Sequence, residues 1–154
     1  MSATLRGLGL CIDDLGSTFG TSSAPPMTPG TMVEDDTGHQ YMFVYNTGST
    51  SITQYYGAFH TSTSNLAYIA NVGLGTGQAY AGAAMTAIDS SEYGWICIKG
   101  LCTVYASAAV ATIGWAVRGG TLGVHACTQY QDAHIGYAVV TNAAAGTLMV
   151  KLNI

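Results

Sequence analysis

Short apolar runs, separated by glycine and polar turn residues, follow one another along most of the chain. The clearest runs are Gln40–Tyr45 and Thr147–Leu152, where aromatic and β-branched residues favour strands. In the second run Leu148, Val150 and Leu152 alternate with other residues, so one side of that strand is apolar. The pattern predicts an all-β fold, a small β-barrel or β-sandwich domain.

Turn residues between these runs predict a hairpin near each end of the domain. At the first, Met32–Val33 leads through the polar turn Glu34–Gly38 into the strand that starts at Gln40. At the last, Val139–Thr141 is joined to the final strand by the turn Asn142–Gly146. Between the two hairpins, Ser51–Tyr56 is predicted as a further strand.

A small pattern of glycine, aromatic residue and apolar run occurs three times in the second half of the chain. It covers Gly94–Ile98, Gly114–Arg118 and Gly136–Val140, with starts separated by 20 and 22 residues. Glycine in a strand lets the strand bend or lets another backbone approach closely. This spacing is typical of strand pairs in a barrel or sandwich.

Only Ala79–Ile88 has the composition of a helix, since alanine is the best helix former. Gly82 interrupts the segment and its flanks have the composition of strands. A strand is therefore predicted here, with a helix as the alternative.

Residues 1–30 are predicted to form an extended N-terminal arm, and residues 31–154 a single β domain. All three prolines lie in the arm, and proline is unsuited to helix interiors and central strands. The arm also carries more apolar side chains than a linker needs, which predicts that it lies along a neighbouring surface. The residues expected to make protein contacts are Leu5, Leu8, Leu10, Ile12, Leu15, Phe19, Pro25, Pro26, Tyr55 and Tyr56.

Charge is scarce, because only 8% of residues are charged against about 25% in an ordinary soluble domain. The surface must then be covered by uncharged polar groups or be hidden by partners, as in an oligomer or a larger assembly. The four basic residues do not cluster and the net charge is −4, which disfavours binding to nucleic acid or to an anionic membrane. No apolar run of about 18 residues or more predicts a spanning helix, and no signal peptide is recognised, so we expect synthesis in the cytoplasm.

Two cysteines raise the question of a disulfide. If Lys99–Gly100 is a two-residue turn, Cys97 and Cys102 face each other on adjacent strands, near disulfide geometry. Synthesis in a reducing compartment favours free thiols instead.

Metal binding has a few candidate ligands, of which His125 with Cys127 and Asp132 with His134 are spaced to share a strand face. Surface or core-edge histidine is the preferred interpretation for these and for the other histidines, His39 and His60. Calcium binding through Asp13-Asp14 or Glu34–Asp36 matches no known loop spacing, so polar turns are preferred. We expect no metal and no cofactor.

Catalytic motifs are also missing from the sequence. Gly73–Gly77 lacks the lysine of a phosphate-binding loop and is interpreted as a turn. No G-x-S-x-G elbow occurs, and nothing selects Asp89 and Glu92 as a catalytic carboxylate pair. Trp95, Trp115 and the tyrosines are interpreted mainly as core residues, with the remainder as interface anchors or, alternatively, a sugar-binding platform.

The stretch Glu92–Gly100 resembles the E-Y-G-W-V-x-V-x-G segment of small decoration proteins of tailed bacteriophages, also called head-stabilising or cement proteins. Ile135–Ala138 is similar to their I-G-x-A strand and Gly146–Leu152 to their terminal strand, and the likeness extends over about residues 29–152. The chain departs from the family at Gly114–Val117 and in its longer, proline-bearing arm.

This resemblance implies a β-barrel-like fold, trimers, attachment to the outside of the major capsid protein lattice, and no enzymatic activity. We therefore expect a virion structural protein on the capsid exterior, whose partners are the major capsid protein and other copies of itself. The alternatives are another virion component, from the tail, a fibre or the portal region, a carbohydrate-binding module, and an enzyme.

Overall fold

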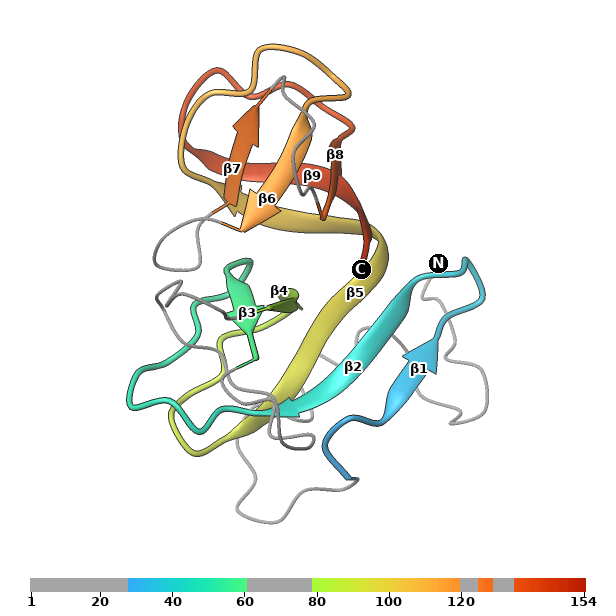
Figure 1. The fold of residues 1–154 in the computed structure, drawn as a ribbon, viewed down its shortest axis with the longest axis vertical. Helices are drawn as coiled ribbons and strands as arrows, with labels where there is room; N and C mark the ends of the chain where they lie inside the picture. Colours follow the sequence, from blue (N-terminus) through green and yellow to red (C-terminus); the bar gives the residue numbers. More distant parts are fainter. Residues whose placement is uncertain (1–27, 61–78, 120–124, 129–134) are drawn as a thin grey trace.

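The computed structural model describes residues 28–60, 79–119, 125–128 and 135–154 (Figure 1). Within these residues every regular element is a strand, which confirms the predicted all-β class. The strands are β1 (Met32–Glu34), β2 (Gln40–Tyr45), β3 (Gly57–Phe59), β4 (Tyr80–Ala84), β5 (Tyr93–Ala106), β6 (Ala116–Gly119), β7 (His125–Thr128), β8 (Gly136–Ala138) and β9 (Gly146–Asn153).

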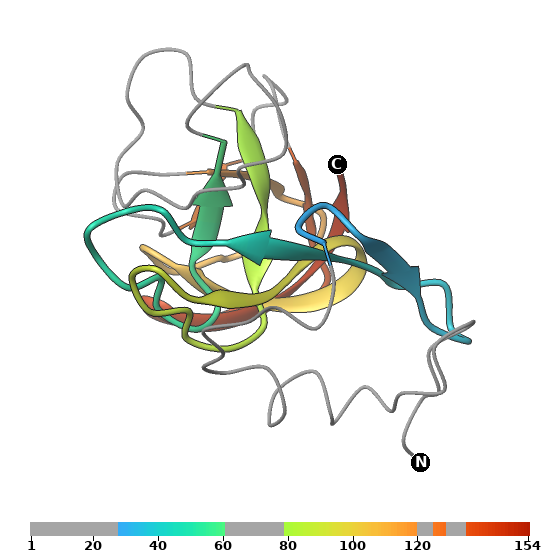
Figure 2. The same cartoon turned by 90° about the horizontal axis from the view of Figure 1, so that it is seen from below.

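Five of these strands close into a barrel, because β5 pairs with β7, β7 with β6, β6 with β8, β8 with β9, and β9 again with β5. All of these pairings are antiparallel except that of β5 with β7, which is parallel and joins Ala106 to His125. The other four strands extend the sheet from the first half of β5, which lies between β2 and β4. Figure 2 shows β1 at the outer edge of this extension.

The long strand β5 therefore belongs to both parts of the molecule. Its continuity corrects the two-residue turn predicted at Lys99–Gly100, because Lys99 pairs both with Gln40 of β2 and with Asn153 of β9. Gly100 has a φ of +102°, a conformation that glycine adopts without steric cost. It can thus bend the strand without ending it.

Cys97 and Cys102 consequently lie on one strand rather than on two facing strands. Both thiols are free and buried in the same core cluster. A hydrogen bond with Cys97, together with burial, raises the pKa of the Cys102 thiol well above its usual value. The two cysteines thus behave as small core residues.

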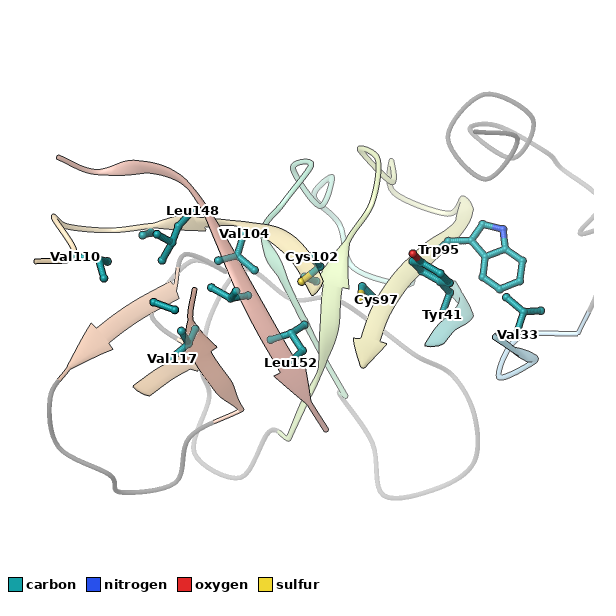
Figure 3. Packing of buried hydrophobic residues seen from close by; sticks show 14 of the residues in the cluster. Val33, Tyr41, Trp95, Cys97, Cys102, Val104, Val110, Val117, Leu148 and Leu152 are labelled. Carbon is teal, nitrogen blue, oxygen red and sulfur yellow. The ribbon is translucent and has the colours of Figure 1, made fainter. Parts of the chain in front are cut away.

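The core is continuous from the open sheet into the barrel. One cluster runs from Val33 and Tyr41 through the cysteines of β5 to Val104 and Leu148, and Figure 3 shows this succession along the strand. A second cluster lies against β4 and the first half of β5, around Ile88. Because β5 supplies side chains to both clusters, its burial couples the two parts of the fold.

The strand predicted at Ser51–Tyr56 is wrong. The segment forms only one bridge, between Ile52 and Ile88, before the chain turns at Tyr55, whose φ is +69°. Regular pairing begins at Gly57, where β3 meets β4. The strand preferred over a helix in Ala79–Ile88 is confirmed as β4.

Both predicted hairpins are confirmed, although the last one has shifted boundaries. β1 pairs with β2 in the register Met32 to Met42. The first strand of the last hairpin is β8, which begins three residues earlier than predicted. Val139–Thr141 therefore lies beyond its end. The buried positions of β9 are Leu148, Val150 and Leu152, as the alternation predicts.

The close backbone approach predicted for the glycine pattern occurs at Gly136. A Cβ atom at this position would lie 2.2 Å from the carbonyl oxygen of Lys151. Only glycine therefore lets β8 lie this close to β9.

Candidate interaction surface

Most of the residues predicted to make protein contacts lie in the arm, outside the described residues, and their role stays a prediction. They are Leu5, Leu8, Leu10, Ile12, Leu15, Phe19, Pro25 and Pro26.

Tyr55 and Tyr56 are described, and both are half-buried. The amide of Tyr55 donates to the carbonyl of Ala84 at 2.8 Å, and its own carbonyl accepts from the amide of Tyr105 at 2.9 Å. The Tyr56 and Tyr105 rings have centroids 5.3 Å apart. These contacts connect the loop before β3 to β4 and β5, so the two tyrosines have an internal role in the described structure.

A different set of side chains forms an exposed apolar surface on the barrel. We call it the outer face and define it as Leu101 of β5, Met149 and Lys151 of β9, and Tyr137 of β8. Leu101 pairs with Lys151, which pairs in turn with Tyr137, so these three side chains form one row across three strands. Leu101, Tyr137 and Met149 are 46%, 43% and 45% exposed. Neighbouring exposed apolar groups are a common feature of surfaces that bind other proteins, so the outer face is a candidate interaction surface.

The sequence analysis did not single out the outer face. The sequence did indicate that Met149 is exposed. It lies on the same side of β9 as the polar residues Thr147 and Lys151, opposite the apolar side. Leu101 and Tyr137 carried no such signal, since their meeting with β9 depends on the pairing of three strands that are distant in sequence.

A groove of about 520 Å³ lies at one end of the outer face. It is formed where the β1–β2 turn approaches the bend of β5 and the end of β9. Its lining consists of Thr37, Gly38, His39, Lys99, Gly100, Leu101, Tyr137, Lys151, Leu152 and Asn153.

One wall of the groove is held by the buried carboxylate of Asp35. The Oδ1 atom of Asp35 accepts hydrogen bonds from the amides of Thr37 and His39, each at 2.9 Å, and Oδ2 lies 2.8 Å from Nδ1 of His39. Burial alone would raise the pKa of Asp35, but hydrogen bonds from Thr37 and His39 outweigh it and lower the pKa below its usual value. The polar turn predicted at Glu34–Gly38 is thus confirmed, and its carboxylate serves the turn.

The groove is positively charged. Lys99 and Lys151 are both exposed and both line it. Neither forms an ion pair with a described residue. Two of the chain's four basic residues are therefore available beside the apolar outer face.

His125 is fully buried at the junction between the barrel and the open sheet. Its Nδ1 lies 3.3 Å from the carbonyl of Tyr105 and its Nε2 lies 2.7 Å from the hydroxyl of Tyr80. A carbonyl can only accept, so Nδ1 carries the proton and Nε2 accepts from Tyr80. Burial lowers the pKa of His125 to about 4. This histidine is a core residue whose two nitrogens are already used.

No group of three or more His, Cys, Asp or Glu residues that could hold a metal ion occurs in the described part of the chain. The predicted face of Asp132 and His134 lies outside that part, as do Asp13-Asp14 and Gly73–Gly77. The Oδ1 atom of Asp89 accepts a hydrogen bond of 2.6 Å from the Ser51 hydroxyl. The described residues contain no helix long and apolar enough to span a membrane.

Comparison with known proteins identifies a fold. No protein-family model matches the chain, and no curated protein matches it. Among solved structures, the chain is similar to the N base of the head fibre protein gp8.5 of bacteriophage phi29. The similarity has a TM-score of 0.50 at 14% sequence identity, and it covers 73% of this chain and 94% of the phage chain. The chain shares its fold with this base.

Proposed function

We propose that this protein is a structural component of a bacteriophage virion, located on the outside of the head. The observation that carries the proposal is the fold shared with the N base of a phage head fibre protein. The sequence resemblance of Glu92–Gly100 to phage decoration proteins is separate support, because it lies in the residues themselves and not in the fold.

Two roles on the head are compatible with this proposal, and they differ in number and purpose. A decoration protein binds the major capsid protein lattice at many sites and stabilises the shell by multivalent contact. The base of a head fibre attaches an appendage to the head. The resemblance of sequence to decoration proteins favours the first role, and the fold shared with a head fibre base favours the second.

The surface of the protein is suited to assembly in either role. Charged residues are only 8% of the chain, and the outer face leaves apolar side chains in solvent on a rigid barrel. Stable protein interfaces typically have an apolar centre and few charged residues there.

The copy number of the protein in purified phage particles tests the proposal. Quantitative mass spectrometry against the major capsid protein should give hundreds of copies for a decoration protein and a few dozen at most for a fibre or tail component. Imaging of the intact particle should place its density outside the head shell. Absence of the protein from purified particles would reject the virion role.

A further inference from the structure

The groove and the outer face together present, beside apolar side chains, two lysines that form no ion pair with any described residue. Lys99 and Lys151 lie two strand positions apart across β5 and β9, because Lys99 pairs with Asn153 and Lys151 with Leu101. Tyr137 extends the same row onto β8. A ligand that fits this surface must supply both apolar side chains and carboxylates.

The chain itself contains a segment with that chemistry. Residues 8–15 read Leu-Gly-Leu-Cys-Ile-Asp-Asp-Leu and lie outside the described residues. An extended segment places alternate side chains on one side, so the side that carries Leu8, Leu10 and Ile12 would also carry Asp14. Asp14 therefore places a carboxylate on the same side as these apolar residues, as the lysines require, while the adjacent Asp13 lies on the other side.

We infer that the groove and outer face bind residues 8–15 of a second copy of this chain. The carboxylate of Asp14 pairs with Lys99 and Lys151, and the side chains of Leu8, Leu10 and Ile12 cover the apolar row. Contact of this kind adds an extended peptide to a preformed surface.

The linker between the segment and the domain is long enough for the segment to reach a second copy, and the scarcity of charge on the chain favours a surface covered by such copies. Twelve residues, 16–27, separate Leu15 from the first described residue, Thr28, and an extended linker of that length reaches about 40 Å. Proline favours an extended backbone, so Pro25-Pro26 suits a linker that spans the distance to another copy. Arms exchanged between copies would also assemble the protein without any other partner.

Charge reversal on each side tests the inference with the full chain. The groove variant carries Lys99→Glu and Lys151→Glu, and the arm variant carries Asp13→Lys and Asp14→Lys. The wild type should self-associate in sedimentation or light scattering, and each variant alone should self-associate at least about tenfold more weakly. Because Lys99 and Lys151 are exposed, circular dichroism and the unfolding midpoint should stay unchanged.

Mixing the variants distinguishes a second copy from the same chain. An equimolar mixture of the groove and arm variants should associate again, since each has the partner that the other lost. The four-fold variant with both reversals should also associate. If the four-fold variant associates and the mixture does not, the arm of one copy does not bind the groove of another, and the inference is overturned.

Arg118→Glu is the matched control, because Arg118 is an exposed basic residue of the barrel that does not line the groove. It should self-associate like the wild type. If the groove variant also self-associates like the wild type, the inference is wrong. This holds even if that variant no longer binds phage particles. These measurements need no phage particle, so their failure is distinguishable from failure of the proposed virion role.

Discussion

Gly100 shows how one residue shapes both a strand and the groove beside it. Its φ of +102° lies in the region that glycine favours. A Cβ atom here would lie 2.1 Å from a ring carbon of His39. That ring cannot swing away freely, because its Nδ1 faces the carboxylate of Asp35. The bend of β5 and the wall of the groove therefore both require a residue without a side chain at position 100.

We predict that Gly100→Ala lowers the free energy of unfolding by about 3 kcal/mol, from backbone strain and a steric clash together. Gly38→Ala is the control, because Gly38 has a φ of +87° with no atom near its would-be Cβ. Gly38→Ala should lower the free energy of unfolding only through backbone strain, by about 1 kcal/mol. Urea unfolding of both variants measures the difference, and equal losses would contradict the clash.

His125 makes stability depend on pH. Its pKa falls from 6.5 in the unfolded chain to about 4 in the fold, so between these values the unfolded state binds more protons. The stabilisation is complete above pH 6.5 and is lost as the pH falls toward 4, by up to about 3 kcal/mol.

We predict that His125→Gln, which keeps a polar side chain but cannot titrate, removes this dependence. The wild type should be more stable than the variant at pH 7, and the difference in unfolding free energy should shrink as the pH is lowered to 4.5. Urea titrations at a series of pH values provide the measurement. A difference that stays constant over this range would show that His125 does not titrate between the two states.

At the scale of elements, β9 separates packing from surface within one strand. Leu148, Val150 and Leu152 are buried on the barrel interior, while Met149 is 45% exposed on the outer face. The same strand thus packs the barrel interior with one side and leaves Met149 exposed on the outer face with the other.

We predict that Leu148→Ala lowers the free energy of unfolding by about 3 kcal/mol, through lost burial and a residual cavity. Met149→Ala, the adjacent truncation, should change it by less than about 0.5 kcal/mol. Chemical denaturation compares the two variants. A large loss for Met149→Ala would mean that this side chain is covered within the single chain.

At the scale of the whole molecule, β5 joins a closed barrel to an open sheet extension. One core cluster extends across both parts, from Val33 to Leu152. The barrel fixes the outer face, and the turn of the extension completes the groove beside it. The proposed binding of residues 8–15 depends on this arrangement, since the groove lies where the two parts meet.

The sequence by itself determined the strand class, both hairpins and the inward side of β9, because these features depend on neighbours in the chain. Alternation and turn residues act over a few positions, and a strand records them directly. The boundaries of β8 and the strand predicted at Ser51–Tyr56 were wrong for one reason. Partner strands that are distant in sequence decide where regular pairing begins, and local sequence does not contain them.

Only the tertiary structure decided the closure of the barrel, the continuity of β5 and the surface beside them. Leu101, Tyr137 and Lys151 form one row because three strands pair in a particular register. Local sequence does not encode that register, which is set by the packing of the core as a whole. The same packing leaves these three side chains outward, where another chain can reach them.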